Sequence, residues 1–185
     1  MQREYRIEGY AIVSADGMIA DAQGRFPAVL KNDADKRFFR AALDAATAVA
    51  LGRITHEQER NLGRRRLVLT RRVASLGPDP GDPHALFWNP GGASWESARL
   101  AIGLRQGSLA VIGGADVYVV FLALGYDAFH LTRVNGAEIP DGRPVFPNVG
   151  RDRMPEDVLR AHGLKSGPVR LLDPAADVTL VTWTA

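Results

Sequence analysis

Three short stretches of the sequence combine glycine, arginine and hydroxyl side chains directly after an apolar run. The stretches are LGRIT, LTRR and VIGGADVY, and the residues concerned are Gly52, Arg53, Thr55, Thr70, Arg71, Gly113 and Gly114. A glycine lets backbone N–H groups come close to an anion, and the forked donors of arginine fit a phosphate. The three stretches together predict an extended polyphosphate ligand, for which a dinucleotide is the natural candidate.

Each stretch also has a plainer explanation when it is taken alone. Gly113 and Gly114 can form a tight strand-to-helix turn, and Arg53 and Arg71 can be solvated side chains in turns. Asp116, in the first turn of the helix expected after the glycine pair, would repel an anion. Only the combination of three similar strand ends favours a ligand.

A carboxylate in the stretch DADKRFFRAAL is the fourth feature that could do chemistry. Asp35, Phe39 and Ala42 are spaced i, i+4 and i+7, so they share one face of a predicted helix. An apolar face desolvates the carboxylate and raises its pKa, which suits it to bind a cationic ring edge or to relay a proton. The alternative is a solvated acid in the first helical turn that favours the helix dipole.

The elements that must position these residues alternate between strands and helices. Strands are expected at 5–13, 47–52, 67–70, 85–88, 108–114 and 126–134, and helices at 32–46, 53–60, 94–106 and 115–125. The Pro/Gly-rich stretch 76–84 is expected to be a loop. The tail segments 169–173 and 177–185 have no helix between them. We therefore expect an α/β fold whose mostly parallel sheet has an antiparallel C-terminal edge and binds its ligand at the carboxyl ends of the strands.

Composition excludes several classes of function. The chain has 185 residues, 46% hydrophobic and 24% charged, with a net charge of +2, so we expect one soluble domain over residues 1–185 and no nucleic-acid partner. It has no cysteine, and no pair of its four histidines has metal-ligand spacing, so no metal is expected. No signal region or apolar run of about 18 residues is present, which favours a cytoplasmic protein without a membrane partner.

In this order, the segments AVALGRITHE, LVLTRR, AVIGGADVYVVFLALGYDAFHLTRV and RPVFP resemble the dihydrofolate reductase-like superfamily. That superfamily includes dihydrofolate reductase and the reductase domain of the bifunctional riboflavin-biosynthesis deaminase-reductase. The resemblance runs from about Tyr5 to Phe146. It implies a three-layer fold with helices on both faces of the sheet, NADPH as cofactor and, by analogy with the pyrimidine reductases, a homodimer.

The resemblance assigns cofactor contacts to five groups of residues. It implies contacts to cofactor phosphates from Gly52, Arg53 and Thr55, and to the adenosine 2′-phosphate from Thr70 and Arg71. It places Gly113, Gly114, Ala115, Val117 and Tyr118 at the pyrophosphate and nicotinamide. It also places Ala11 and Ile12 beside the nicotinamide and substrate ring, and Ile19 and Ala20 at the start of a mobile loop.

On the substrate side, Asp35 matches the acid that binds the pterin, and Thr132 matches the threonine that hydrogen-bonds to that acid. Both are therefore expected to be catalytic. Phe39 matches an aromatic that packs on the substrate, and Arg64 an arginine that holds a substrate carboxylate. Leu30 stands about where dihydrofolate reductases have a tryptophan.

The stretch SADGMIAD is closer to the riboflavin pyrimidine reductases, in which the residue matching Asp16 lies near cofactor and substrate. No zinc deaminase motif is present. The expected function is thus a stand-alone NADPH-dependent reductase that acts on a ribosylated pyrimidine or a pterin, with dihydrofolate reductase as the alternative.

Two functions of other classes remain open. One is a nucleotide-binding module without catalysis. The other is nucleic-acid binding through the arginine runs 64–66 and 71–72, which is less favoured because no aromatic residues are interleaved with them.

Overall fold

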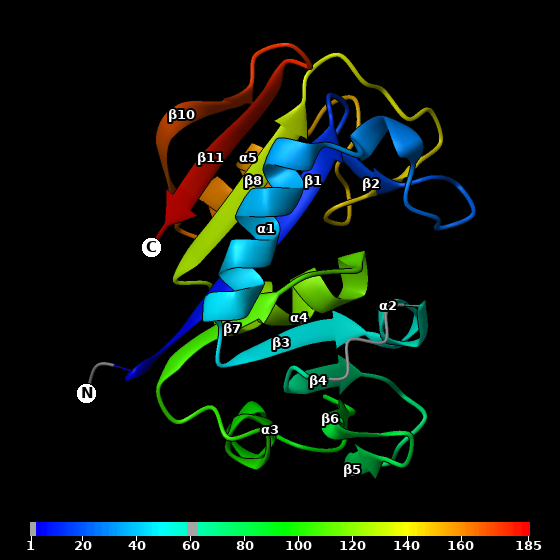
Figure 1. Ribbon diagram of the computed structural model, residues 1–185, viewed down its shortest axis with the longest axis vertical. Helices are drawn as coiled ribbons and strands as arrows, with labels where there is room; N and C mark the ends of the chain where they lie inside the picture. The colour runs from blue at the N-terminus through cyan, green and yellow to red at the C-terminus, as the bar shows by residue number, and fades with distance from the viewer. Residues whose placement is uncertain (1–2, 59–62) are drawn as a thin grey trace.

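The computed structural model describes residues 3–58 and 63–185 (Figure 1). Its strands are β1 (Tyr5–Ser14), β2 (Met18–Ala20), β3 (Ala48–Gly52), β4 (Arg66–Leu69), β5 (Leu76–Asp79), β6 (Asp82–Trp88), β7 (Gly107–Val111), β8 (Ala128–Val134), β9 (Arg143–Pro144), β10 (Lys165–Asp173) and β11 (Val178–Thr184). Its α-helices are α1 (Asp33–Ala45), α2 (Arg53–Gln58), α3 (Trp95–Ala101), α4 (Ala115–Leu124) and α5 (Pro155–Ala161), and a 3-10 turn, η1, spans Ala28–Leu30.

The strands form one nine-stranded sheet in the order β10-β11-β8-β1-β7-β3-β4-β6-β5 and a small β2–β9 pair. Neighbouring strands from β8 to β6 run parallel, whereas β11 is antiparallel to β8 and β10 to β11. The predicted mostly parallel sheet with an antiparallel C-terminal edge is therefore confirmed.

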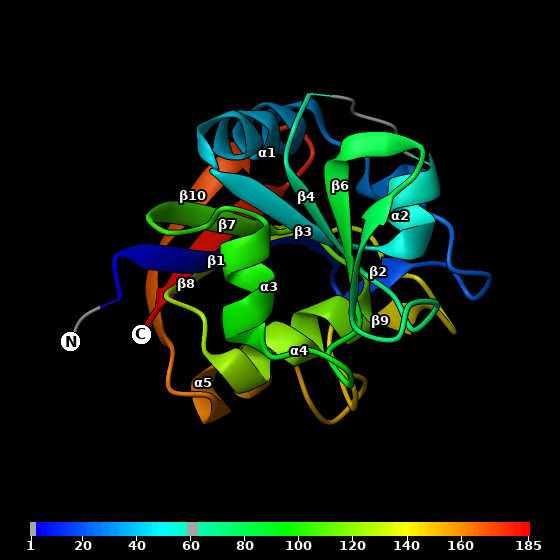
Figure 2. The ribbon, with the colours of Figure 1, turned by 90° about the horizontal axis from the view of Figure 1, so that it is seen from below.

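Helices cover both faces of the sheet (Figure 2). On one face, Phe38, Phe39 and Leu43 of α1 pack against a cluster that includes Val49 and Leu51 of β3. On the other face, α3, α4 and α5 contribute to a larger core with the fully buried residues Ala98, Phe121 and Leu159. The three layers follow from parallel crossovers, because each helix must return across a face of the sheet.

The stretch 76–84, expected to be a loop, instead forms β5 and the start of β6. Pro78 and Pro83 are tolerated because β5 is the edge of the sheet and Pro83 lies near the start of β6. The carboxylate of Asp79 accepts a hydrogen bond of 2.8 Å from the backbone of Gly81 and so closes the hairpin turn. Helix α5 was also not anticipated, although Pro155 at its first position followed by two acidic residues is a helix-start signal.

A gap in the strand pairing opens the sheet at its carboxyl edge. Strand β1 pairs with β8 as far as Ser14–Val134, but with β7 only as far as Gly9–Val111. The last five residues of β1 therefore lack a β7 neighbour. This divergence places the residues after Gly9 and those after Val111 on opposite sides of an opening.

Within residues 3–58 and 63–185, no helix has both the length and the apolar character needed to cross a membrane.

Candidate functional site

A cleft of about 2060 Å³ runs along the carboxyl ends of β1, β3, β4 and β7, bordered by α1, α2 and the start of α4. With one exception, the residues that the sequence assigned to the site line it. They are Ala11, Ile12, Ile19, Ala20, Leu30, Asp35, Phe39, Gly52, Arg53, Thr55, Arg64, Thr70, Arg71, Gly113, Gly114, Ala115, Val117, Tyr118 and Thr132. Residues far apart in the chain thus meet in one concave surface.

The two glycine-containing strand ends are joined directly. The backbone N–H of Gly52 donates to the carbonyl of Gly113 over 3.1 Å. Gly113 has φ +124°, and a Cβ there would lie 3.3 Å from the phenol oxygen of Tyr118, so the turn itself requires glycine. A Cβ on Gly114 would meet nothing within 4 Å. The turn therefore explains Gly113 but leaves the backbone of Gly114 open to the cleft.

Gly114 is the N-cap of α4 and provides no side-chain hydrogen bond to the helix. The first backbone N–H groups of an α-helix have no partner within the helix, and the helix dipole makes this end positive. Ala115 and Asp116, at the start of α4, border the cleft. This end of the cleft therefore has main-chain donors suited to an anion, opposed in part by the charge of Asp116.

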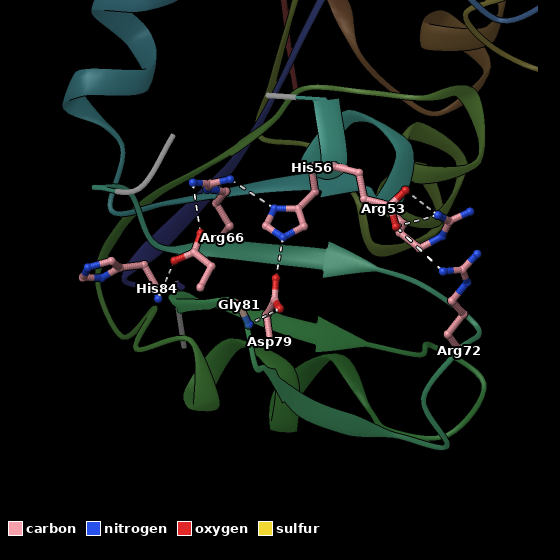
Figure 3. A network of polar contacts seen from close by, with 9 residues as sticks. Arg53, His56, Arg66, Arg72, Asp79, Gly81 and His84 are labelled. Atoms are coloured by element: carbon pink, nitrogen blue, oxygen red, sulfur yellow. Dashed lines mark hydrogen bonds and ion pairs between the residues drawn. The ribbon is translucent and has the colours of Figure 1, made fainter. Parts of the chain in front are cut away.

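The arginines Arg53, Arg71 and Arg72 line the cleft. Figure 3 shows Arg53 and Arg72 close to one another. Arg53 donates to both carboxylate oxygens of Glu57 over 2.7 and 2.6 Å, and Arg72 lies 3.8 Å from Glu57. The hydrogen bond from Arg53 lowers the pKa of Glu57. Arg71 is exposed and forms no hydrogen bond or ion pair within the described part of the chain. Arg71 is thus available to a ligand, whereas Arg53 is shared with Glu57.

The carboxylate end of the cleft begins with a fixed helix start. Asn32 caps α1, since its side-chain oxygen accepts from the backbone N–H groups of Ala34 and Asp35 over 3.0 Å each. Its side-chain amide donates to Asp173 of β10 over 2.8 Å. The first turn of α1 is therefore tied to the edge of the sheet, which sets the position of Asp35.

Asp35 is half-buried, and burial raises the pKa of its carboxyl group above the usual range. The hydroxyl of Thr132 forms a hydrogen bond with Asp35 that partly opposes this shift of the pKa. Burial and the nearby charge of Asp35 raise the pKa of the Tyr118 phenol, which donates to the carbonyl of Tyr10 over 2.5 Å. The structure therefore brings Asp35 and Thr132 together as expected and also places Tyr118 close to Asp35, and Asp35 is not a fully solvated helix-start acid.

A second polar cluster lies beside this site and was missed from the sequence. Tyr10 and His130 line the cleft and stack with ring centroids 4.6 Å apart. The Tyr10 phenol donates to Glu8 over 2.8 Å, and His130, the phenol and Arg6 together lower the pKa of Glu8 to about 2. The i, i+2 spacing of Glu8 and Tyr10 on a strand is the signal that could have placed both on one face.

A buried polar network beneath α2 was also missed (Figure 3). His56 contacts Asp79 over 2.7 Å and Arg66 over 3.1 Å, and Arg66 lies 3.1 Å from Asp82. The Arg66 side chain is 3% exposed. Arg66 is therefore not part of a solvated basic face, whereas Arg65 of the same run is exposed. The arginine run 64–66 gives the nucleic-acid interpretation less support than its sequence indicates.

Three residues assigned to the substrate have other contacts. Asp16 does not line the cleft: its carboxylate accepts from the Ser14 hydroxyl over 2.5 Å and from the Ile139 backbone over 3.2 Å, and so fixes the turn after β1. Arg64 borders the cleft but is ion-paired with Asp44. Leu30, the last residue of η1, borders the cleft, but its side chain is fully buried in the core.

Sequence searches find no matching family model and no matching curated protein. Solved structures do match. A riboflavin biosynthesis protein from Shewanella sp. PV-4, described there as putative, is 15% identical with a TM-score of 0.67, and the match covers 97% of this chain and 98% of that one. A diaminohydroxyphosphoribosylaminopyrimidine deaminase/5-amino-6-(5-phosphoribosylamino)uracil reductase from Thermotoga maritima is 18% identical with a TM-score of 0.67. That match covers 98% of this chain but 56% of the other. The chain therefore has the fold that its resemblance to the dihydrofolate reductase-like superfamily predicts.

Proposed function

We propose that the protein is an NADPH-dependent reductase that transfers hydride to an electrophilic carbon of a flat heterocycle or of a sugar-derived C=O or C=N group. One observation carries this proposal: a single cleft joins an end with open main-chain donors and arginines to an end with a desolvated carboxylate. The first end suits a polyphosphate, and the second suits the edge of a ring that must be held and protonated.

The chain offers suitable groups for NADPH. Arg53, Thr55 and the open backbone at Gly114 would hold the phosphates that join the two nucleosides, and the unpaired Arg71 would hold the 2′-phosphate. The divergence of β1 from β7 leaves Ala11 and Ile12 beside an opening between the two ends of the cleft. When bound, NADPH supplies the hydride.

The residues of the chain would bind and orient the substrate and donate a proton to it. The raised pKa of Asp35 means that its carboxyl oxygen holds a proton to a higher pH than an ordinary aspartate does. Thr132 fixes the direction of that carboxyl group through its hydroxyl. The carboxyl oxygen of Asp35 would bind the ring edge of the substrate and pass it a proton, directly or through a water molecule.

A pyrimidine with a ribose-phosphate side chain is the substrate that we favour. Lys36 and Arg40 lie one helical turn apart on α1 and both border the cleft near Asp35, where they would attract an anionic side chain. The Thermotoga maritima neighbour is described as a reductase of such a compound. Dihydrofolate is the second candidate, because the Asp35–Thr132 pair matches the pterin-binding acid and its threonine. The homodimer and the cytoplasmic location stay predictions.

The test has two stages. Titration with NADPH, followed by quenching of protein fluorescence, is expected to give saturable binding; no response at millimolar NADPH would contradict the proposal. NADPH oxidation is then followed at 340 nm with the ribosylated aminouracil phosphate and with dihydrofolate. Tight NADPH binding without oxidation by either compound would instead support a nucleotide-binding module.

A further inference from the structure

The short helix α2 is attached to the sheet through a polar side chain. His56 is the one buried residue of its six, whereas Ile54 on the same helix is 56% exposed. Apolar burial therefore contributes little to the position of α2. The hydrogen bonds of His56 must therefore hold α2 on the sheet, as apolar packing does for most helices.

The two ring nitrogens of His56 have partners from two different strands. Arginine can only donate, so Nδ1 of His56 accepts from Arg66 of β4 over 3.1 Å. Nε2 therefore carries the hydrogen and donates to Asp79 of β5 over 2.7 Å. With both nitrogens engaged, the tautomer and the rotation of the ring are fixed (Figure 3).

Asp79 and Arg66, the two partners of His56, are fixed by further polar contacts. The second oxygen of Asp79 accepts from the backbone of Gly81 over 2.8 Å, and Arg66 lies 3.1 Å from the buried carboxylate of Asp82. Both acids belong to the β5–β6 hairpin. The hairpin thus provides a rigid polar base for the helix.

Helix α2 borders the cleft, and so does Arg66 of the base beneath it. Arg53 and Thr55 line the cleft, whereas His56 and Asp79 do not. His56 follows Thr55 directly and lies three residues after Arg53, so rotation or lifting of α2 displaces both side chains. His56 can therefore influence a bound anion only by positioning other groups.

We propose that His56 and Asp79 form a positioning pair that sets Arg53 and Thr55 for contact with the ligand phosphates. This inference rests on the proposed function, because it assumes that those two side chains meet the phosphates of NADPH. It assigns a role in ligand binding to the Pro/Gly-rich hairpin, whose residues Asp79 and Asp82 do not border the cleft.

The test compares variants of His56 by their dissociation constants for NADPH and for inorganic pyrophosphate. His56→Leu removes both hydrogen bonds, and His56→Gln preserves an acceptor for Arg66 and a donor for Asp79. We expect His56→Leu to weaken NADPH at least about tenfold, with kcat at saturating NADPH nearly unchanged, and His56→Gln to remain within about threefold of the wild type. His84→Ala, an exposed change in the same hairpin, is the matched control.

The outcomes separate this inference from the proposed function. If the wild type binds NADPH and His56→Leu binds it equally well, the positioning pair is refuted and the reductase proposal stands. If the wild type does not bind NADPH but binds pyrophosphate, and His56→Leu loses it, the positioning pair is supported and the reductase proposal fails. Binding of neither probe by the wild type contradicts both.

A variant that fails to fold does not remove the test. Asp79→Asn keeps one acceptor oxygen, for His56 or for Gly81, replaces the other oxygen with an NH2 group and loses the charge. Its NADPH affinity should therefore lie between those of the wild type and His56→Leu. Equal losses of melting temperature in His56→Leu and His56→Gln, without a difference in NADPH affinity, would show that His56 acts on stability alone.

Discussion

The two ends of the cleft differ in what their binding groups are made of. The anion end uses main-chain groups at Gly114 and exposed arginines, of which Arg71 has no ion pair within the described residues. The carboxylate end uses side chains from α1, β8 and α4, and burial there raises the pKa of Asp35. One end is therefore positive and exposed, and the other carries a desolvated carboxyl group whose pKa is raised.

This difference separates binding from chemistry. Anion contacts act on the ground state and the transition state alike, so they affect affinity more than rate. A group that transfers a proton during the reaction affects the rate. Changes at the two ends should therefore appear in different kinetic constants.

The largest expected effect is at the carboxylate end. Asp35→Asn keeps the shape of the side chain but removes the carboxyl proton, and we expect kcat to fall about 100-fold or more with the Kd for NADPH changed less than threefold. Steady-state kinetics and NADPH titration measure the two quantities. An unchanged kcat would remove Asp35 from the mechanism.

Gly114→Ala should act on affinity. The added methyl group meets no protein atom within 4 Å and would occupy open space at the start of α4 that a phosphate would fill. We expect NADPH to bind about tenfold more weakly. Gly113→Ala is the matched contrast: its φ of +124° makes alanine strained, so a loss of thermal stability of about 1–2 kcal/mol is expected. If Gly114→Ala binds NADPH as well as the wild type, the strand-to-helix turn alone explains the two glycines Gly113 and Gly114.

Arg71→Ala tests the part of the anion end that distinguishes NADPH from NADH. Loss of one guanidinium–phosphate contact should weaken NADPH about fivefold to tenfold and leave NADH nearly unchanged. Arg105→Ala, at the amino end of β7, controls for the overall loss of positive charge. Equal losses for the two cofactors would exclude Arg71 as the 2′-phosphate contact.

The pKa shifts predict opposite effects on stability. The folded pKa of Asp35 is raised, so its ionisation costs stability as pH rises through that pKa. Asp35→Asn should therefore raise the free energy of unfolding at pH 7, and the gain should vanish at acid pH.

The pKa of Glu8 is lowered to about 2, so its ionised form stabilises the fold above the unfolded pKa, and this stabilisation is lost as pH falls. Glu8→Gln should destabilise the protein at pH 7 but not near pH 2. Denaturant unfolding at several pH values measures both, and effects of the same sign would contradict the assigned shifts.

Glu57→Gln should have the smallest effect. Glu57 is 52% exposed and competes for Arg53 with any anion in the cleft. Its neutralisation should strengthen NADPH binding about twofold to threefold at low salt and less at high salt. A weaker affinity in the variant would mean that Glu57 orients Arg53 rather than competing for it.

The positions of the strand ends could be predicted because their signals are local. An apolar run that stops at Gly52 or Gly113 specifies a buried strand and a turn, and alternation with helices specifies parallel crossovers that bring such ends to one edge. The cap at Asn32 and the first-turn position of Asp35 also follow from residues next to each other in the chain.

The hairpin 76–84 was mispredicted because its prolines indicate a loop unless the strand is known to be an edge, and edge position is a property of the whole sheet. Asp16 was misplaced for a similar reason. Its partner, the backbone of Ile139, is distant in the chain and no residue pattern marks it.

The sequence by itself determined the order of the elements and the residue types at the strand ends, because periodicity and turn chemistry act over a few residues. Only the tertiary structure decided the raised pKa of Asp35 and the buried contacts of His56. Both depend on burial and on partners such as Thr132 and Asp79, which are 97 and 23 residues away in the chain. Desolvation and long-range hydrogen bonds exist only once the chain has folded.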